Sequence, residues 1–225
     1  MLKIEDLSIQ KNIELGSKDG FIIVDMQYDF IPGGALPVEG GDQIIPGINQ
    51  LAKAFKESGA LIVQTQDWHP KDHLSFASNH PGKKPGDEYS ELDGLGPILW
   101  PDHCVQGTKG AEFHQNLQTI YTHSIIRKGI DPKVDSYSGF RDKNKKKETG
   151  LRGYLQSLNI ERLFICGLAL DYCVYFTAID GVEFGFKVYV IPELTKGIDD
   201  PQDNISKALD DMNSKGILYA DLNSF

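Results

Sequence analysis

The chain has 225 residues, of which 40% are hydrophobic and 24% charged, and its formal net charge is −9 with an isoelectric point near 5.1. This is the composition of a globular protein with room for one large core. An acidic chain argues against binding to nucleic acid or to an anionic membrane, because both require clustered Lys and Arg. No apolar run approaches the about 18 residues that a membrane span needs.

The cysteine content and the N-terminal segment bear on the cellular compartment. The three cysteines are Cys104, Cys166 and Cys173. An odd, small number makes no disulfide framework and favours a reducing compartment. The N-terminus carries acidic side chains where a signal peptide would be apolar. We therefore expect a cytoplasmic, soluble protein with an N-terminal extension over residues 1–18 and a single domain over residues 19–225.

Short runs rich in Ile and Val predict the strands of a parallel sheet. In chain order they cover residues 21–24, 60–63, 124–126, 163–166 and 187–191, and a sixth strand is expected around 216–219. Unbroken apolar runs of this length are typical of strands buried on both faces of a parallel sheet.

Stretches with helical spacing separate these runs. Residues 42–58 carry apolar side chains three and four apart, and Gly59 follows as a stop. Residues 151–158 and 172–184 read similarly, and a last helix is expected from near 201 to before 216. The alternation indicates an α/β fold, a three-layer αβα sandwich around a six-stranded, mainly parallel sheet with right-handed crossovers.

The stretch from 69 to 110 differs from the rest of the chain. It is rich in Pro, Gly and His and has little periodicity. Long irregular segments in compact domains are usually functional loops or disorder. Its aromatic and His content favours a functional loop region.

The polar residues that follow the predicted strands are the first candidates for chemistry. Ligands of open parallel sheets bind beyond the carboxyl ends of the strands. Asp25, Asp67 and Lys128 stand at three of these ends, and the loop after the fourth strand leads to Cys173.

Cys173 is the candidate nucleophile. It is expected at a helix N-terminus, which stabilises a thiolate, after a Gly-containing turn that can offer backbone N–H groups to an oxyanion. Asp25 can accept the thiol proton, and the Lys128 ammonium can lower the pKa of the thiol. The plainer alternatives are a buried apolar cysteine and two residues that merely cap or pair.

Asp67, His69 and His103 form a second candidate group. Asp67 and His69 are two residues apart at a strand end and project to the same face. A third ligand from His103 would give a three-ligand metal site with open positions. The alternative is that surface loops contain His by chance, since the chain has six.

Five blocks of the chain, between Gly20 and about Val190, resemble the nicotinamidase/pyrazinamidase family of the isochorismatase-like hydrolase superfamily. Their centres read VDMQYDF from Val24, QDWHP from Gln66, WPDHCVQGT from Trp100, DSYSGF from Asp135 and CGLALDYCV from Cys166. Five blocks in order and at plausible spacing make the resemblance highly specific.

The resemblance implies roles for the candidate residues. Asp25, Lys128 and Cys173 align with the family's catalytic triad. The aligned metal ligands are Asp67, His69 and His103, with zinc favoured and iron or manganese as alternatives. Aligned residues of the substrate pocket are Phe30 and Trp100, which sandwich the pyridine ring, and Tyr137 nearby.

The turn before Cys173 and the metal loop carry further implications of the resemblance. The backbone N–H groups of Ala169 and Cys173 align with the oxyanion hole, and the Leu168–Ala169 peptide is cis in relatives. Some members have a further His ligand at the position of Ser75, where this chain could contact a metal only through a bound water. Leu170 replaces a Thr that is common in this turn.

The implied activity is hydrolysis of nicotinamide to nicotinic acid and ammonia through a Cys173 thioester, in NAD salvage, with the ring nitrogen of the substrate on the metal. Isochorismatases and N-carbamoyl amidases share the scaffold but lack the Asp67, His69 and His103 set. A non-catalytic binding or scaffold protein remains an alternative from another class. Turnover of pyrazinamide and assembly into a homo-oligomer are left open.

Overall fold

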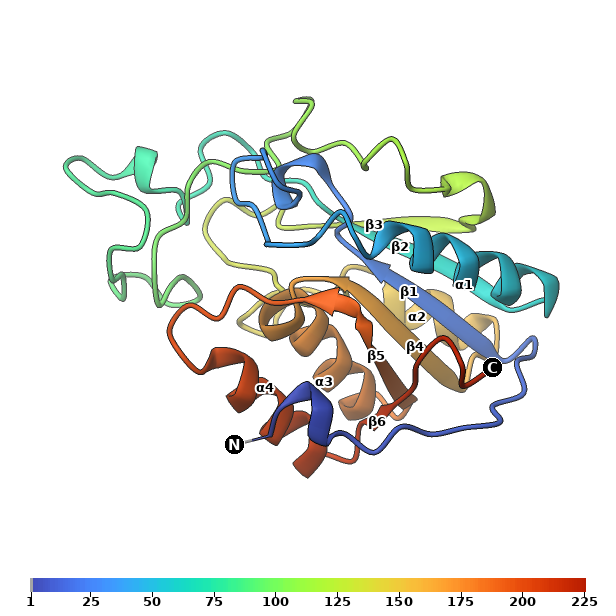
Figure 1. Cartoon of the computed structure of the whole chain (residues 1–225). Helices are drawn as coiled ribbons and strands as arrows, with labels where there is room; N and C mark the ends of the chain where they lie inside the picture. The colour runs from blue at the N-terminus through green and yellow to red at the C-terminus, as the bar shows by residue number, and fades with distance from the viewer. Residues whose placement is uncertain (1) are drawn as a thin grey trace.

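The sheet of the computed structural model, which describes residues 2–225, has six strands in the order β3-β2-β1-β4-β5-β6. Every neighbouring pair is parallel, as Figure 1 shows. The strands are β1 (Asp19–Val24), β2 (Leu61–Asp67), β3 (Ser124–Lys128), β4 (Arg162–Leu168), β5 (Lys187–Lys196) and β6 (Leu218–Tyr219). The predicted parallel sheet is confirmed.

Helices cover both faces of the sheet. One face packs against α1 (Ile45–Glu57), and the other packs against α2 (Leu151–Ser157), α3 (Tyr175–Glu183) and α4 (Asn204–Ser214). The alternation of side chains along β1 explains the two cores, because Phe21 and Ile23 join one cluster while Ile22 and Val24 join the other. The three-layer αβα architecture is therefore confirmed.

The structure differs from the sequence prediction around Cys173. The prediction began a helix at residue 172, whereas a π-helical turn over Leu170–Val174 precedes α3, which starts at Tyr175. Cys173 thus lies inside a wide turn and not at the start of an α-helix. Periodicity could not reveal this, because an inserted residue leaves the apolar pattern on either side intact.

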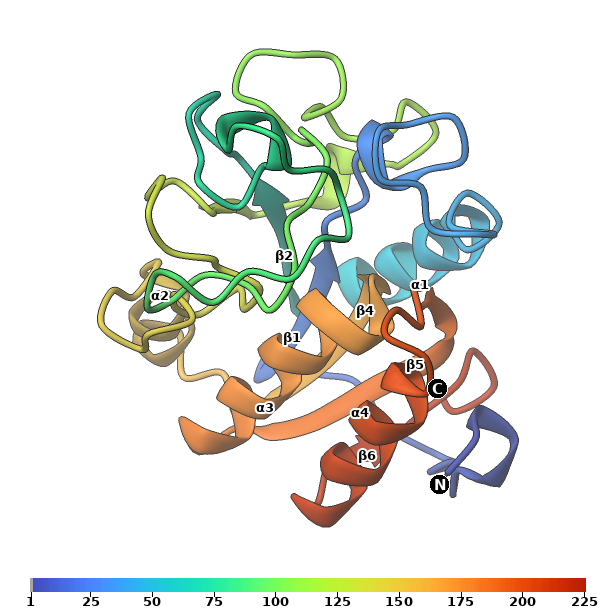
Figure 2. The same ribbon diagram turned by 90° about the vertical axis from the view of Figure 1, so that its left-hand side faces the viewer.

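The long connection between β2 and β3 is irregular and lies at the carboxyl end of the sheet. Figure 2 looks onto that end, and the green segment spreads across it. The connection contains only two short 3₁₀ turns, Ala77–Asn79 and Thr119–Tyr121. A small buried cluster of Ala77, Tyr89, Leu95 and Leu99 gives the segment its own apolar support.

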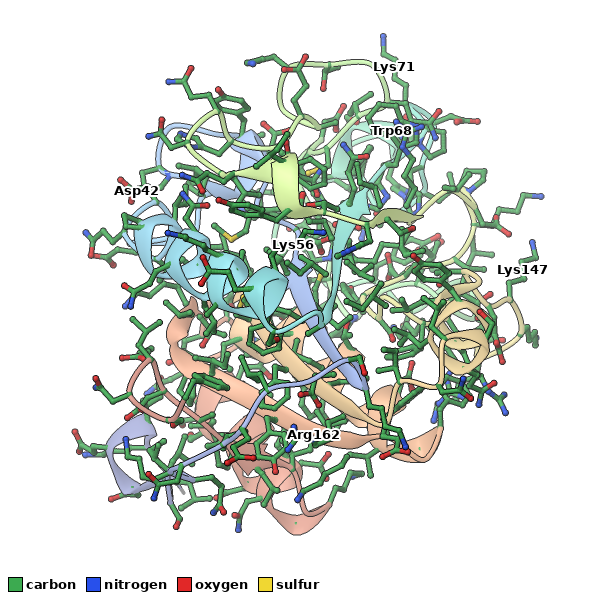
Figure 3. The ribbon with its side chains drawn as sticks, turned by 90° about the vertical axis from the view of Figure 1, so that its right-hand side faces the viewer. Asp42, Lys56, Trp68, Lys71, Lys147 and Arg162 are labelled. Atoms are coloured by element: carbon green, nitrogen blue, oxygen red, sulfur yellow. The ribbon has the colours of Figure 1, made fainter. Side chains whose placement is uncertain are left out.

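The N-terminal segment packs along the opposite side of the molecule. Ile9 forms a parallel bridge with Tyr219 beside β6. Arg162, labelled in the lower part of Figure 3, binds both carboxylate oxygens of Asp19 at 2.6 and 2.7 Å and also donates to the carbonyl of Glu14.

The division into an extension over residues 1–18 and one domain over 19–225 stays a prediction. No helix within residues 2–225 is long and apolar enough to cross a membrane.

The aromatic cluster under α1 should make a large contribution to stability. Phe55 is fully buried, and its ring lies 4.7 Å from Phe21, 5.2 Å from Phe164 and 5.7 Å from Phe225 between centroids. Phe55→Ala should lower the free energy of unfolding in urea by about 3–5 kcal/mol, because it leaves a cavity that neighbouring rings cannot fill. Ile120→Ala is the control, since Ile120 is 84% exposed. Equal losses in the two variants would contradict this assignment of the core.

Candidate active site

The candidate residues meet because four neighbouring strands end at the same edge of the sheet. Asp25 follows β1, Asp67 ends β2, Lys128 ends β3, and Cys173 lies in the turn after β4. Those strands are adjacent in the order β3-β2-β1-β4, and Asp67 is the direct register partner of Lys128. Residues up to 148 positions apart in sequence, from Asp25 to Cys173, are thereby brought into one buried cluster.

Lys128 lies at the centre of this cluster. Its Nζ atom is 2.8 Å from Oδ2 of Asp25, 2.5 Å from Oδ1 of Asp67 and 3.3 Å from Sγ of Cys173. It also donates to the carbonyl of Ser136 at 3.2 Å. The ammonium therefore joins the proposed base, the proposed nucleophile and a proposed metal ligand.

Burial and the shared ammonium set the pKa values of the three charged groups. Burial alone would lower the pKa of Lys128, but Asp25 and Asp67 outweigh it and raise that pKa well above its ordinary value. For Asp67, the opposing effect of burial is exceeded by Lys128 and His69, which hold the pKa below its ordinary value. Burial raises the pKa of Asp25 despite the attraction of Lys128.

The thiol of Cys173 differs from the expectation. The sequence predicts that Lys128 and a helix N-terminus lower its pKa. In the structure, burial raises the pKa of Cys173 well above its ordinary value, and the two carboxylates add to this against the attraction of Lys128. The residue is therefore a thiol at neutral pH and needs a base to become a nucleophile. Asp25 offers that base, since one of its carboxylate oxygens lies within 4.8 Å of Sγ.

Asp67, His69 and His103 are arranged as a metal site would require. One possible ligand atom of each lies within 4.8 Å of the other two, and all three residues are buried. Nδ1 of His69 is 2.9 Å from the carbonyl oxygen of Gly129, and Nδ1 of His103 is 2.7 Å from that of Pro101. A carbonyl only accepts, so each neutral ring carries its proton on Nδ1 and keeps the Nε2 lone pair for a cation. The donor set fits one divalent metal ion.

His73 and Ser75 lie beside the three proposed ligands. The rings of His69 and His73 are 4.7 Å apart between centroids, and Ser75 Oγ is 2.8 Å from Nδ1 of His73. Among the described residues, Nε2 of His73 is buried without a hydrogen-bond partner. The structure thus places His73 beside this group, although the sequence indicates no reason to count it as a ligand. The water-mediated role of Ser75 stays a prediction.

Aromatic side chains wall a pocket above Cys173. Its lining includes Phe30, Trp100 and Tyr137 together with Ala169 and the three proposed metal ligands. The indole N–H of Trp100 donates to the hydroxyl of Tyr137 at 3.2 Å, which fixes the two rings relative to each other. Asp25 and Lys128 lie behind Cys173, outside this lining. The Leu168–Ala169 peptide is cis, as the resemblance implied.

Two further buried residues support the site, although the sequence alone indicates no role for either. Gln27 accepts the Asp67 amide at 2.7 Å through Oε1 and donates through Nε2 to the carbonyl of Asp67 at 2.8 Å. Asp135 lines the pocket and accepts the hydroxyl of Tyr137 at 3.4 Å. Their only sequence signal is that both stand inside motif blocks, two residues from Asp25 and from Tyr137 respectively.

The chain is similar to proteins of known family. The isochorismatase domain model matches residues 19–221. A nicotinamidase of Acinetobacter baylyi is 49% identical over 178 residues, which are 79% of this chain and 81% of that protein.

Two solved structures are similar as well. A pyrazinamidase of Pyrococcus horikoshii in complex with zinc has a TM-score of 0.74 and 41% identity, covering 91% of this chain and 99% of that one. Yeast nicotinamidase bound to the inhibitor nicotinaldehyde has a TM-score of 0.81 and 35% identity, covering 90% and 99%. With a domain model over most of its length, a relative at nearly half identity and the same fold, the chain belongs to the isochorismatase family.

Proposed function

We propose that the chain is a nicotinamidase, an amidohydrolase that converts nicotinamide to nicotinic acid and ammonia in NAD salvage. The observation that carries the proposal is the pocket in which Cys173 lies beneath aromatic walls, with Asp25 and Lys128 behind it and Asp67 beside it. The naming of the A. baylyi relative and the inhibitor of the yeast enzyme support the same reaction.

In the proposed reaction, Asp25 and Cys173 carry the chemistry. Asp25 takes the proton from the thiol, and the thiolate attacks the carboxamide carbon. The backbone N–H groups of Ala169 and Cys173 bind the resulting oxyanion, and each such donor contributes about 2.7–4 kcal/mol in comparable sites. Asp25 gives the thiol proton to the leaving nitrogen, the C–N bond breaks, and ammonia departs. A thioester between the substrate carbonyl and Cys173 remains. Asp25 then takes a proton from water, whose oxygen attacks the thioester carbon. As the C–S bond breaks and nicotinic acid is released, Asp25 gives this proton to the Cys173 thiolate and restores the thiol.

Lys128 supports the proton transfer between Cys173 and Asp25 without taking part in it. Its ammonium balances the charge of Asp25 and stabilises the thiolate as it forms, without giving up its own proton, because the two carboxylates hold its pKa high. Phe30 and Trp100 are proposed to sandwich the pyridine ring, with Tyr137 holding the indole in place. The aromatic walls favour a flat heterocycle over an aliphatic amide.

Asp67, His69 and His103 are proposed to hold one divalent cation. When bound there, it supplies a Lewis acid that anchors the ring nitrogen of the substrate. Zinc is our first choice, with iron and manganese as alternatives, because carboxylate and imidazole ligands suit all three. A cytoplasmic location and a homo-oligomeric state stay predictions.

Replacement of the nucleophile tests the mechanism. Cys173→Ala should lower ammonia release from nicotinamide by about 10⁴-fold or more, because no other group can form the thioester. Nicotinamide should still bind, as measured by calorimetry, because the pocket walls are unchanged.

Cys166→Ala is the matched control. Cys166 is a fully buried cysteine on β4, and its side chain packs in the core rather than in the pocket. This variant should keep its turnover within about threefold of wild type. Measurable turnover by Cys173→Ala would refute the covalent scheme, and no ammonia release by the metal-replete wild type would refute the function.

Removal of a proposed ligand tests the metal site. His103→Ala should weaken metal binding by at least about 100-fold, since loss of groups that merely orient ligands already costs 10–100-fold. Elemental analysis after dialysis measures the bound metal and identifies it. His123→Ala, at an exposed His after the second 3₁₀ turn, is the control and should retain the metal. Full metal content in His103→Ala would exclude this residue as a ligand.

A further inference from the structure

The side chain of Asp25 needs a fixed orientation if it is to act as the base. Its backbone has a φ of +47°, in the left-handed region, directly after β1. Oδ2 faces the Lys128 ammonium at 2.8 Å, and the residues that the structure describes give it no further hydrogen bond. The Lys128 ammonium is shared among Asp25, Asp67, Cys173 and the carbonyl of Ser136, so it does not by itself fix the rotation of the Asp25 carboxylate. Another group must therefore set its rotation.

Thr65 on β2 supplies that group. The Thr65 hydroxyl donates to Oδ1 of Asp25 at 2.6 Å. Oγ1 of Thr65 also accepts a hydrogen bond from the backbone N–H of Asp25 at 3.3 Å. The two bonds hold the carboxylate and the backbone of one residue from a single oxygen atom. Thr65 is completely buried, so no water competes for the hydroxyl.

We propose that Thr65 is a positioning residue of catalysis, whose hydroxyl occupies Oδ1 of Asp25 and leaves Oδ2 as the oxygen that exchanges protons with the substrate and Cys173. This inference rests on the proposed function and goes beyond it. Among the residues that the structure describes, the groups that face Asp25 include Thr65 and Asp67 from β2, Lys128 from β3 and Cys173 from the turn after β4. Thr65 is the member of this set that has no titratable group.

A purely structural role for Thr65 can be separated from the positioning role. Its methyl group packs closely on the backbone at Gly139, where an added Cβ would come within 2.8 Å of Thr65 Cγ2. Valine keeps this methyl contact and nearly the same volume but cannot donate to Oδ1. Serine keeps the hydroxyl and loses only the methyl. The two replacements therefore divide the side chain into its hydrogen bond and its packing.

The test compares Thr65→Val with Thr65→Ser by steady-state kinetics on nicotinamide. Thr65→Val should lower kcat by about 10²-fold, the size of effect expected when a reacting group is misplaced by about 1 Å. KM and the bound metal should stay within about threefold of wild type, because neither the pocket wall nor a ligand is changed. Thr65→Ser should keep most of the wild-type kcat.

Two further variants make the result decisive. Thr122→Val removes a Thr hydroxyl that also bonds a β2 side chain, Nε2 of Gln64, away from the pocket, and it should leave kcat unchanged. If Thr65→Val does not fold, Thr65→Ala and Thr65→Ser give the same comparison, since they differ chiefly by the hydroxyl.

The proposal is overturned if Thr65→Val keeps a wild-type kcat, or if Thr65→Ser falls as far as Thr65→Val. A parallel loss of metal would also overturn it, because the effect would then pass through Asp67 two residues later. Each of these results requires an active wild type, so failure here is distinct from failure of the proposed function.

Discussion

The constraint on which the rest of the site depends is the burial of one ammonium group. A lysine without water around it is stable as a cation only if carboxylates replace the lost solvation. Lys128 meets this condition with two of them, Asp25 and Asp67, at 2.8 and 2.5 Å. Asp67 consequently belongs to two groups at once, as a partner of the lysine and as a proposed ligand. The proposed catalytic residues and the proposed metal site share one charge network.

This sharing explains why so much polar structure is buried behind the pocket. Two carboxylates around one ammonium leave an excess negative charge, which further hydrogen bonds must spread. Thr65 donates to the carboxylate of Asp25 and takes up part of this charge, while Gln27 bonds the backbone N–H and carbonyl of Asp67 and holds that residue in place. Replacing any one of these groups by an apolar side chain leaves a buried donor or acceptor unsatisfied. The polar residues at this edge of the sheet thus act as a unit.

The sequence predicted the strands and the candidate site residues better than the hydrogen bonds that hold those residues in place. Apolar runs identify β1 and β4 because strands buried on both faces have few polar residues. The same rule predicts that the second strand ends at residue 63, whereas β2 continues through four polar residues, the last of which is Asp67. Those polar residues can be buried because they have hydrogen-bond partners in the fold. The partners are distant in sequence, as Asp25 is from Thr65, 40 positions away. Local patterns carry no information on such partners, nor on the π-helical turn that holds Cys173.

The strand order has a consequence for how activity arises as the chain folds. The cluster draws one residue from each of four segments, and β1 must pair with both β2 and β4 before Asp25 meets Lys128 and Cys173. Non-local pairings of this kind form late, because the loops between them must first be closed. A partly folded chain can contain its helices and still lack every element of the cluster. During refolding, the return of turnover would therefore report completion of the central sheet, after helical circular dichroism has recovered.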